Sequence, residues 1–196
     1  YFGNIPSGPV IARPEVNIAK RTGSKRAHYQ DRVPESRVVI SWNTPEWGNK
    51  ENAALDLAAS VLASGKSSRL FKKLVYDKQI CTSAQAFNGP SEIGGTFTIM
   101  ANVKKGKTVA EVETAIWEIV NEFLKNGPTD EEMRRVKAAY FAGFIKGLER
   151  IGGFGGKSDL LAENEVYGGN PEFYKTANQW FNEATAKDVQ MISQKW

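Results

Sequence analysis

The stretch that decides the fold is LDLAASVLASGKSSRLFKKLVYDKQICTSAQAF, residues 55–87. Residues 52–63 are rich in Ala and Leu with apolar side chains at helical spacing, and they predict a helix. Gly65 follows where a helix ends in the left-handed conformation that glycine adopts most easily. Ser67 or Ser68 is then expected to cap a second helix, because a serine oxygen accepts from the free N–H groups of a helix start. The apolar face of that helix consists of Leu70, Phe71, Leu74 and Val75.

The triplet Gly65-Lys66-Ser67 also ends the phosphate-binding loop of nucleotide hydrolases, so a nucleotide site is one alternative. That loop requires another glycine five positions earlier, where this chain has Ser60. It also leaves a buried strand, whereas here a predicted helix runs into Gly65. The sequence therefore favours a helix–loop–helix corner over a phosphate loop.

Strands are predicted on both sides of this corner, in pairs. Alternating or β-branched patterns occur at residues 25–32, 36–43, 80–88 and 95–103. We expect the last two to form an antiparallel hairpin that turns at Asn88-Gly89-Pro90. Residues 1–16 contain three prolines and predict an extended linker.

Helices dominate the second half of the chain. Capping boxes at Thr108/Glu111 and Thr129/Glu132 start two helices, the glycine run at 151–156 makes a joint, Asn170-Pro171 starts a third helix, and Thr185/Asp188 starts a last one. The predicted order is β-β-α-α-β-β-α-α-α-α. This order indicates an α+β fold with an antiparallel or mixed sheet covered by helices.

Composition limits the chemistry. The 196-residue chain carries one histidine, His28, and one cysteine, Cys81, too few for an ordinary zinc site. No Ser–His–Asp set is readable either, because His28 lies in a predicted hairpin, where most histidines are surface residues. The net charge of +4 comes from the first fifty residues, with Lys20, Arg21, Lys25 and Arg26 as the densest part. We interpret these as a solvated basic hairpin, since no nucleic-acid module accompanies them. No apolar run approaches the ~20 residues of a membrane span.

Residues 55–87 resemble the second, non-catalytic repeat of the pitrilysin/insulinase-type zinc metallopeptidases, which include mitochondrial processing peptidase. In that repeat a helix ends at a glycine-containing loop, Ser-Arg-Leu-Phe starts the next helix, and a strand with alternating small residues follows. The resemblance extends to Tyr1-Phe2-Gly3-Asn4-Ile5-Pro6 and to Asn126-Gly127-Pro128-Thr129, and so covers nearly the whole chain.

This resemblance implies a processing-peptidase-like fold, with residues 1–16 as an inter-repeat linker and 17–196 as one repeat truncated at its C-terminus. Because the chain begins without methionine, we expect a piece of a longer protein. The zinc-binding signature His-x-x-Glu-His belongs to the catalytic repeat and is absent here, so zinc is expected in that repeat and no cofactor in this chain. An Arg and a Tyr that assist substrate binding in active relatives are replaced here by Val75 and Thr82.

The resemblance favours a non-catalytic repeat that completes a peptide-binding chamber around a catalytic repeat, in the same chain or in a partner subunit. A possible dimer, a peptide substrate and a bacterial periplasmic or secreted location are further expectations, with no nucleic-acid partner. The corner residues Ser64, Gly65, Lys66, Ser67, Ser68 and Arg69 are predicted to face the chamber, although Arg69 is also suited to pairing with a local carboxylate. The alternatives are a catalytically dead structural relative of processing-peptidase core subunits, and a nucleotide- or nucleic-acid-binding module.

Overall fold

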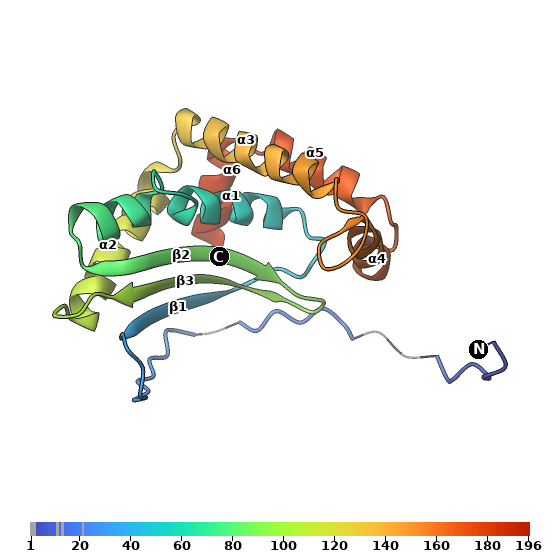
Figure 1. The fold of residues 1–196 in the computed structure, drawn as a ribbon, viewed down its shortest axis with the longest axis horizontal. Helices are drawn as coiled ribbons and strands as arrows, with labels where there is room; N and C mark the ends of the chain where they lie inside the picture. Colours follow the sequence, from blue (N-terminus) through green and yellow to red (C-terminus); the bar gives the residue numbers. More distant parts are fainter. Residues whose placement is uncertain (1–2, 11, 13, 21) are drawn as a thin grey trace.

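A three-stranded antiparallel sheet with the order β1-β3-β2 carries the fold (Figure 1). The computed structural model describes residues 3–10, 12, 14–20 and 22–196. The strands are β1 (Arg37–Thr44), β2 (Cys81–Pro90) and β3 (Gly95–Val103). Because β3 lies in the middle, β1 and β2 form the two edges of the sheet.

Helices cover one face of the sheet (Figure 1). They are α1 (Glu51–Ala63), the π-helical segment η1 (Phe71–Asp77), α2 (Val109–Asn126), α3 (Asp130–Gly147), α4 (Lys157–Gly168), α5 (Phe173–Glu183) and α6 (Ala186–Lys195). Helix α1 packs against β2 and also contacts α3, α5 and α6. Its position explains why it is the most apolar helix of the chain: Leu57 and Val61 are completely buried.

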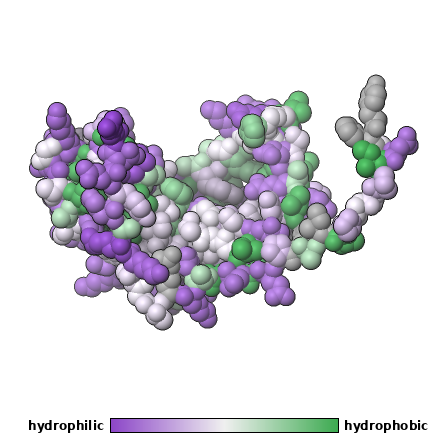
Figure 2. All heavy atoms as spheres, turned by 90° about the horizontal axis from the view of Figure 1, so that it is seen from below, coloured by the Kyte–Doolittle hydropathy of each residue, from purple (hydrophilic) through white to green (hydrophobic). Residues whose placement is uncertain are grey.

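The register of the sheet separates an apolar face from a mixed one. Val38 pairs with Ala101, which pairs with Ala84 on the other side, and all three are buried. The opposite face places Val39 and Phe87 at the surface, 56% and 45% exposed. Seen from below in Figure 2, the molecule is hollowed between two ends on which hydrophilic side chains gather.

Caps fix the helix starts as the sequence predicts. Thr129 accepts from the Glu132 N–H at 3.2 Å while the Glu132 carboxylate accepts from the Thr129 N–H at 2.8 Å. Thr185 and Asp188 form the same reciprocal pair. Thr108 accepts from the Glu111 N–H, but the return bond that would complete a capping box is absent from α2.

Several predicted elements are wrong. Residues 25–32 form no strand; they are extended and exposed, and Arg26 pairs with Glu113 of α2 instead of entering the sheet. Helix α4 was not predicted, because the Gly-rich joint and the polar sequence of α4 mask its weak amphipathic pattern. The fold class, α+β with an antiparallel sheet, is confirmed.

Two element boundaries also differ from the predictions. Strand β2 continues through Pro90, and the hairpin turns at residues 91–94, where the Ser91 N–H donates to the Gly94 oxygen. Helix α5 begins at Phe173, not at Pro171, because the Asn170 side chain caps the turn before it by accepting from the Glu172 N–H.

The segment before β1 is attached to the sheet at two points. The Asn17 N–H donates to the Ile93 oxygen in the hairpin turn, and the Asn43 amide of β1 donates to the Ala19 oxygen. Tyr1 and Phe2 of the predicted linker and Arg21 of the predicted basic hairpin lie outside the described residues. Within the described part of the chain, no helix combines the length and the apolar character needed to cross a bilayer.

Candidate functional site

The corner between α1 and η1 is exposed at residues 64–67. The Ser64 N–H closes α1 by donating to the Ser60 oxygen at 2.9 Å, and Gly65 follows with a φ of +79°. The predicted left-handed glycine is therefore confirmed, and any side chain with a Cβ would be strained there. Arg135 of α3 donates to the Ser64 oxygen at 3.2 Å and so holds the base of the corner.

Ser68 does not cap η1 as predicted. Its side chain is completely buried, and its hydroxyl donates to the Gly65 oxygen at 2.7 Å. The hydroxyl therefore closes the loop on itself, and the backbone oxygen of Ser68 accepts from the Lys72 N–H instead. Its side chain is directed into the domain and away from the exposed corner.

Arg69 is also committed within the domain. Its guanidinium donates two bonds to Glu132 of α3, at 2.8 and 2.7 Å, one to Glu122 of α2 and one to the Gly127 oxygen between these helices. Burial acts to raise the pKa of Glu132, but Arg69 and the Thr129 N–H hold it below its usual value. We name this arrangement the Arg69 clamp; it leaves residues 64–67 as the exposed part of the predicted chamber loop.

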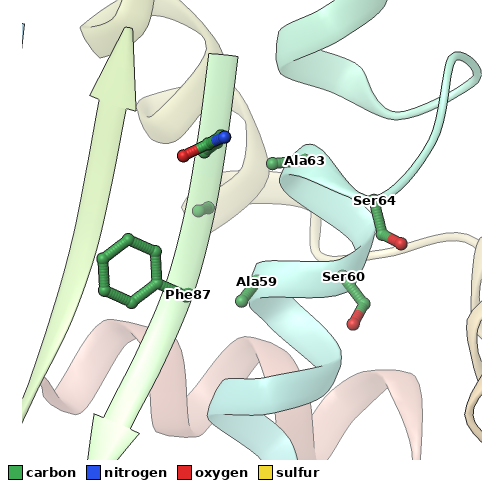
Figure 3. Close-up of a pocket in the computed structure, with 7 residues that line it drawn as sticks. Ala59, Ser60, Ala63, Ser64 and Phe87 are labelled. Carbon is green, nitrogen blue, oxygen red and sulfur yellow. The ribbon is translucent and has the colours of Figure 1, made fainter.

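A groove opens between α1 and the edge strand β2 (Figure 3). Its volume is about 360 Å³. The residues that line it are mostly small: Ala59, Ser60, Ala63 and Ser64 of α1 and its C-cap, and Gln85, Ala86 and Phe87 of β2. The groove therefore adjoins the exposed corner at Ser64.

The outer edge of β2 borders this groove. On its inner side β2 pairs with β3, and a bulge between Cys81 and Ser83 marks the start of that pairing. Among the described residues no backbone group makes a hydrogen bond to the outer edge of β2 within 81–90. An unpaired edge presents N–H and C=O groups that can receive another extended chain.

The two replaced family positions have local roles. Val75 of η1 is half-buried against the core, and Thr82 of β2 donates to the Glu35 carboxylate at 2.7 Å. Neither carries a charged or phenolic group that could polarise a peptide bond. It stays a prediction that Val75 and Thr82 stand where the active type of repeat has the Arg and the Tyr that assist substrate binding.

The residues that could ligate metal are dispersed. Within residues 3–10, 12, 14–20 and 22–196, no three His, Cys, Asp or Glu side chains are arranged to hold a metal ion. His28 is exposed. Cys81 is buried, and this burial raises the pKa of its thiol to about 11, so it is neither a thiolate ligand nor a nucleophile at neutral pH.

A polar cluster between α1 and the sheet was missed by the sequence analysis. Thr44 of β1 donates to Asn88 of β2 at 3.1 Å, and Asn88 donates to Asn52 of α1 at 3.0 Å. Asp56 lies one helical turn from Asn52 and beside the Asn88 amide. Burial raises the pKa of Asp56 to about 7, although the amide offsets part of the shift. The signal in the sequence was a lone aspartate inside an Ala/Leu-rich helix.

A family model described as the inactive domain of M16 peptidases matches residues 1–140. The chain belongs to this family. The inactive domain is 26% identical, over 160 residues, to the zinc protease PqqE of Helicobacter pylori, covering 81% of this chain and 36% of that protein. This chain therefore spans about a third of the length of the curated relative.

Solved structures share the fold of the inactive domain. A protease from Helicobacter pylori is 21% identical with a TM-score of 0.74, over 85% of this chain and 39% of that one. A peptidase M16 inactive domain from Pseudomonas fluorescens is 17% identical with a TM-score of 0.68, over 81% and 37%. The predicted family and the predicted non-catalytic type of domain are confirmed.

Proposed function

We propose that this inactive domain holds extended peptide segments in the groove between α1 and β2 and presents them to a zinc-containing catalytic domain, with which it forms a chamber. The single observation that carries this proposal is the groove itself, about 360 Å³ in volume beside an unpaired strand edge. A peptide that pairs with β2 gains backbone hydrogen bonds without sequence choice, because every residue offers the same N–H and C=O groups.

The lining residues fit this role. Ala59 and Ala63 leave room for the side chains of a peptide, and Figure 3 shows both on the side of α1 that faces β2. The exposed corner 64–67 continues the groove and adds the ammonium of Lys66, which suits acidic segments. The domain supplies binding energy and no reacting group, so we expect changes in the groove to alter KM and to leave kcat unchanged.

The test uses the complete protein together with its catalytic domain. Ala63→Trp fills the groove, because Ala63 lines it and faces β2, and we expect the variant to raise KM for peptide hydrolysis several-fold while kcat and the zinc content stay unchanged. Lys66→Glu should raise KM for acidic peptides and leave basic peptides unaffected. The matched control is Ser158→Trp, which places the same side chain at an exposed position of α4.

Equal KM values for Ala63→Trp, Ser158→Trp and the unmodified protein would overturn the groove as a peptide site. That result would favour a domain with a purely structural role. A change in the melting temperature of Ala63→Trp that Ser158→Trp does not share would identify misfolding, and Ala63→Val would then serve as the milder filling variant.

A further inference from the structure

The glycine-rich loop between α3 and α4 presents a large apolar side chain to solvent. Phe154, inside the glycine run 151–156, is 96% exposed. Ile151 of the same loop is 78% exposed, and Ile145 near the end of α3 is 65% exposed. In Figure 1 this loop and α4 lie at one end of the helical layer. Large apolar side chains that gather at one place on a surface mark an interaction site.

The backbone of this loop is fixed, so the direction of Phe154 is fixed as well. Gly153 and Gly155, on either side of Phe154, have φ values of +79° and +74°. The Asp159 carboxylate accepts from the Gly155 N–H at 2.8 Å, and the Arg150 guanidinium donates to the Phe154 oxygen at 2.9 Å. A side chain that is already held outward costs little further backbone entropy when a partner buries it.

A pocket of about 150 Å³ opens beside the same loop. Its apolar walls are Phe144 and Leu148 of α3 and Leu160 of α4. Gly147 of α3 also lines the pocket, and a Cβ built there meets no atom within 4 Å, so the glycine leaves the pocket open. A cavity of about this volume lined by Leu, Ile and Phe holds one benzene molecule. The pocket therefore has room for a phenyl ring, and Phe154 of the same chain is too exposed to fill it.

The rim of the pocket is held in place and carries charges of both signs. The Glu163 carboxylate accepts from the Trp47 indole N–H at 3.1 Å, and the Lys157 N–H donates to the Arg150 oxygen at 3.0 Å. Lys157 and Glu163 both line the pocket. A surface with both signs is suited to meeting a copy of itself, because the ammonium of one copy can face the carboxylate of the other.

We propose that this surface joins two copies of the chain, with Phe154 of each copy inserted into the pocket of the other. The ring and the pocket lie on one surface, and a two-fold symmetric contact uses the same surface on both copies, so one pairing buries both rings. Two phenyl rings bury roughly 300–500 Å², less than the roughly 1,200–2,000 Å² of a stable interface. The dimer is therefore weak and reversible. It shares no lining residue with the groove between α1 and β2 and does not rest on the proposed function.

Sedimentation equilibrium of the full chain tests the contact. We expect a dimer with a Kd on the order of 10 μM. Phe154→Ala removes the ring, and Gly147→Leu fills the pocket at a helical position without a positive φ. Each variant should raise the Kd at least about tenfold. The control, Tyr76→Ala, removes an aromatic side chain of η1 that is 74% exposed and should leave the Kd unchanged.

An equimolar mixture of the two variants separates this contact from any other. Phe154 of the Gly147→Leu chain meets an open pocket on the Phe154→Ala chain, so a mixed dimer regains one of the two insertions. We expect mixed dimers at concentrations where neither variant associates alone.

A dimer that persists in both variants, or a mixture that forms no mixed dimer, overturns the proposal. So does an unmodified chain that is monomeric at about 300 μM, well above the expected Kd. If such a monomeric chain loses affinity for the catalytic domain in Phe154→Ala, the surface is assigned to that domain and not to a second copy. Should Gly147→Leu fail to fold, Phe154→Ala decides, because its side chain packs on nothing that the fold needs.

Discussion

The charge of Asp56 lowers the stability of the folded domain, because burial disfavours the ionised carboxylate. Asp56 is half-buried and makes no ion pair among the described residues, so its charge loses part of its hydration without gaining a cation in return. A residue that served only the fold could be an asparagine, which would keep the polar contacts to Asn52 and Asn88 without the charge.

The pH dependence of stability provides a test of the Asp56 environment. The pKa in the folded protein, about 7, lies above the ordinary value of 3.8, so the folded state holds the proton more tightly than the unfolded state. The free energy of unfolding should therefore fall as pH rises from about 4 to about 7, by up to about 4 kcal/mol, and then level off. Urea denaturation across this range measures it.

Asp56→Asn should remove most of that slope and raise the stability above pH 7, while Asp77→Asn, which removes an exposed carboxylate, should leave the slope in place. A slope of the same size in Asp56→Asn would show that another group titrates. The sequence could not reveal this shift, since the burial of Asp56 depends on β2 and α3, which pack on α1 only in the folded chain.

At the scale of elements, the Arg69 clamp joins the start of η1 to the junction between α2 and α3. Its side chain is 14% exposed, and its planar group satisfies two carboxylates and one backbone oxygen at once. Glu132 therefore serves two elements, because it also closes the capping box of α3. Arg69 and Glu132 are in contact, although 63 positions separate them in the sequence.

Arg69→Lys should lower the free energy of unfolding by about 2 kcal/mol or more, because an ammonium cannot reproduce the two parallel bonds to Glu132. The control is Lys78→Met, which breaks the more exposed pair with Glu118 and should cost less than about 1 kcal/mol. Urea denaturation compares the two variants. Equal losses would mean that the clamp contributes no more than a surface ion pair.

Elements that depend on neighbouring residues were mostly predicted correctly from the sequence. Features that depend on residues distant in the sequence were harder to predict. Caps such as Thr129 and the left-handed Gly65 depend on neighbouring residues and could be identified directly. Residues 25–32 alternate like a strand but join neither edge of the sheet, and Arg26 pairs with Glu113 of α2 instead. The groove could not be predicted, because Ser60 and Phe87 belong to different elements whose separation is set by packing.

At the scale of the whole molecule, the inactive domain should neither bind stoichiometric zinc nor hydrolyse peptides on its own. A catalytic zinc needs about three protein ligands, and the described residues do not assemble them. Metal analysis of the purified chain and a peptidase assay check this. One tightly held zinc per chain that disappears in His28→Ala would contradict it.

The contact between α1 and α6 joins distant parts of the chain. Lys195 and Trp196 both bond to Glu51, 144 and 145 positions away, and α6 packs along α1. A ribosome adds about 5–20 residues per second. The part of α1 that α6 covers must therefore wait on the order of ten seconds for that helix during synthesis. A nascent chain held in that state offers chaperones a binding site that the finished domain no longer has.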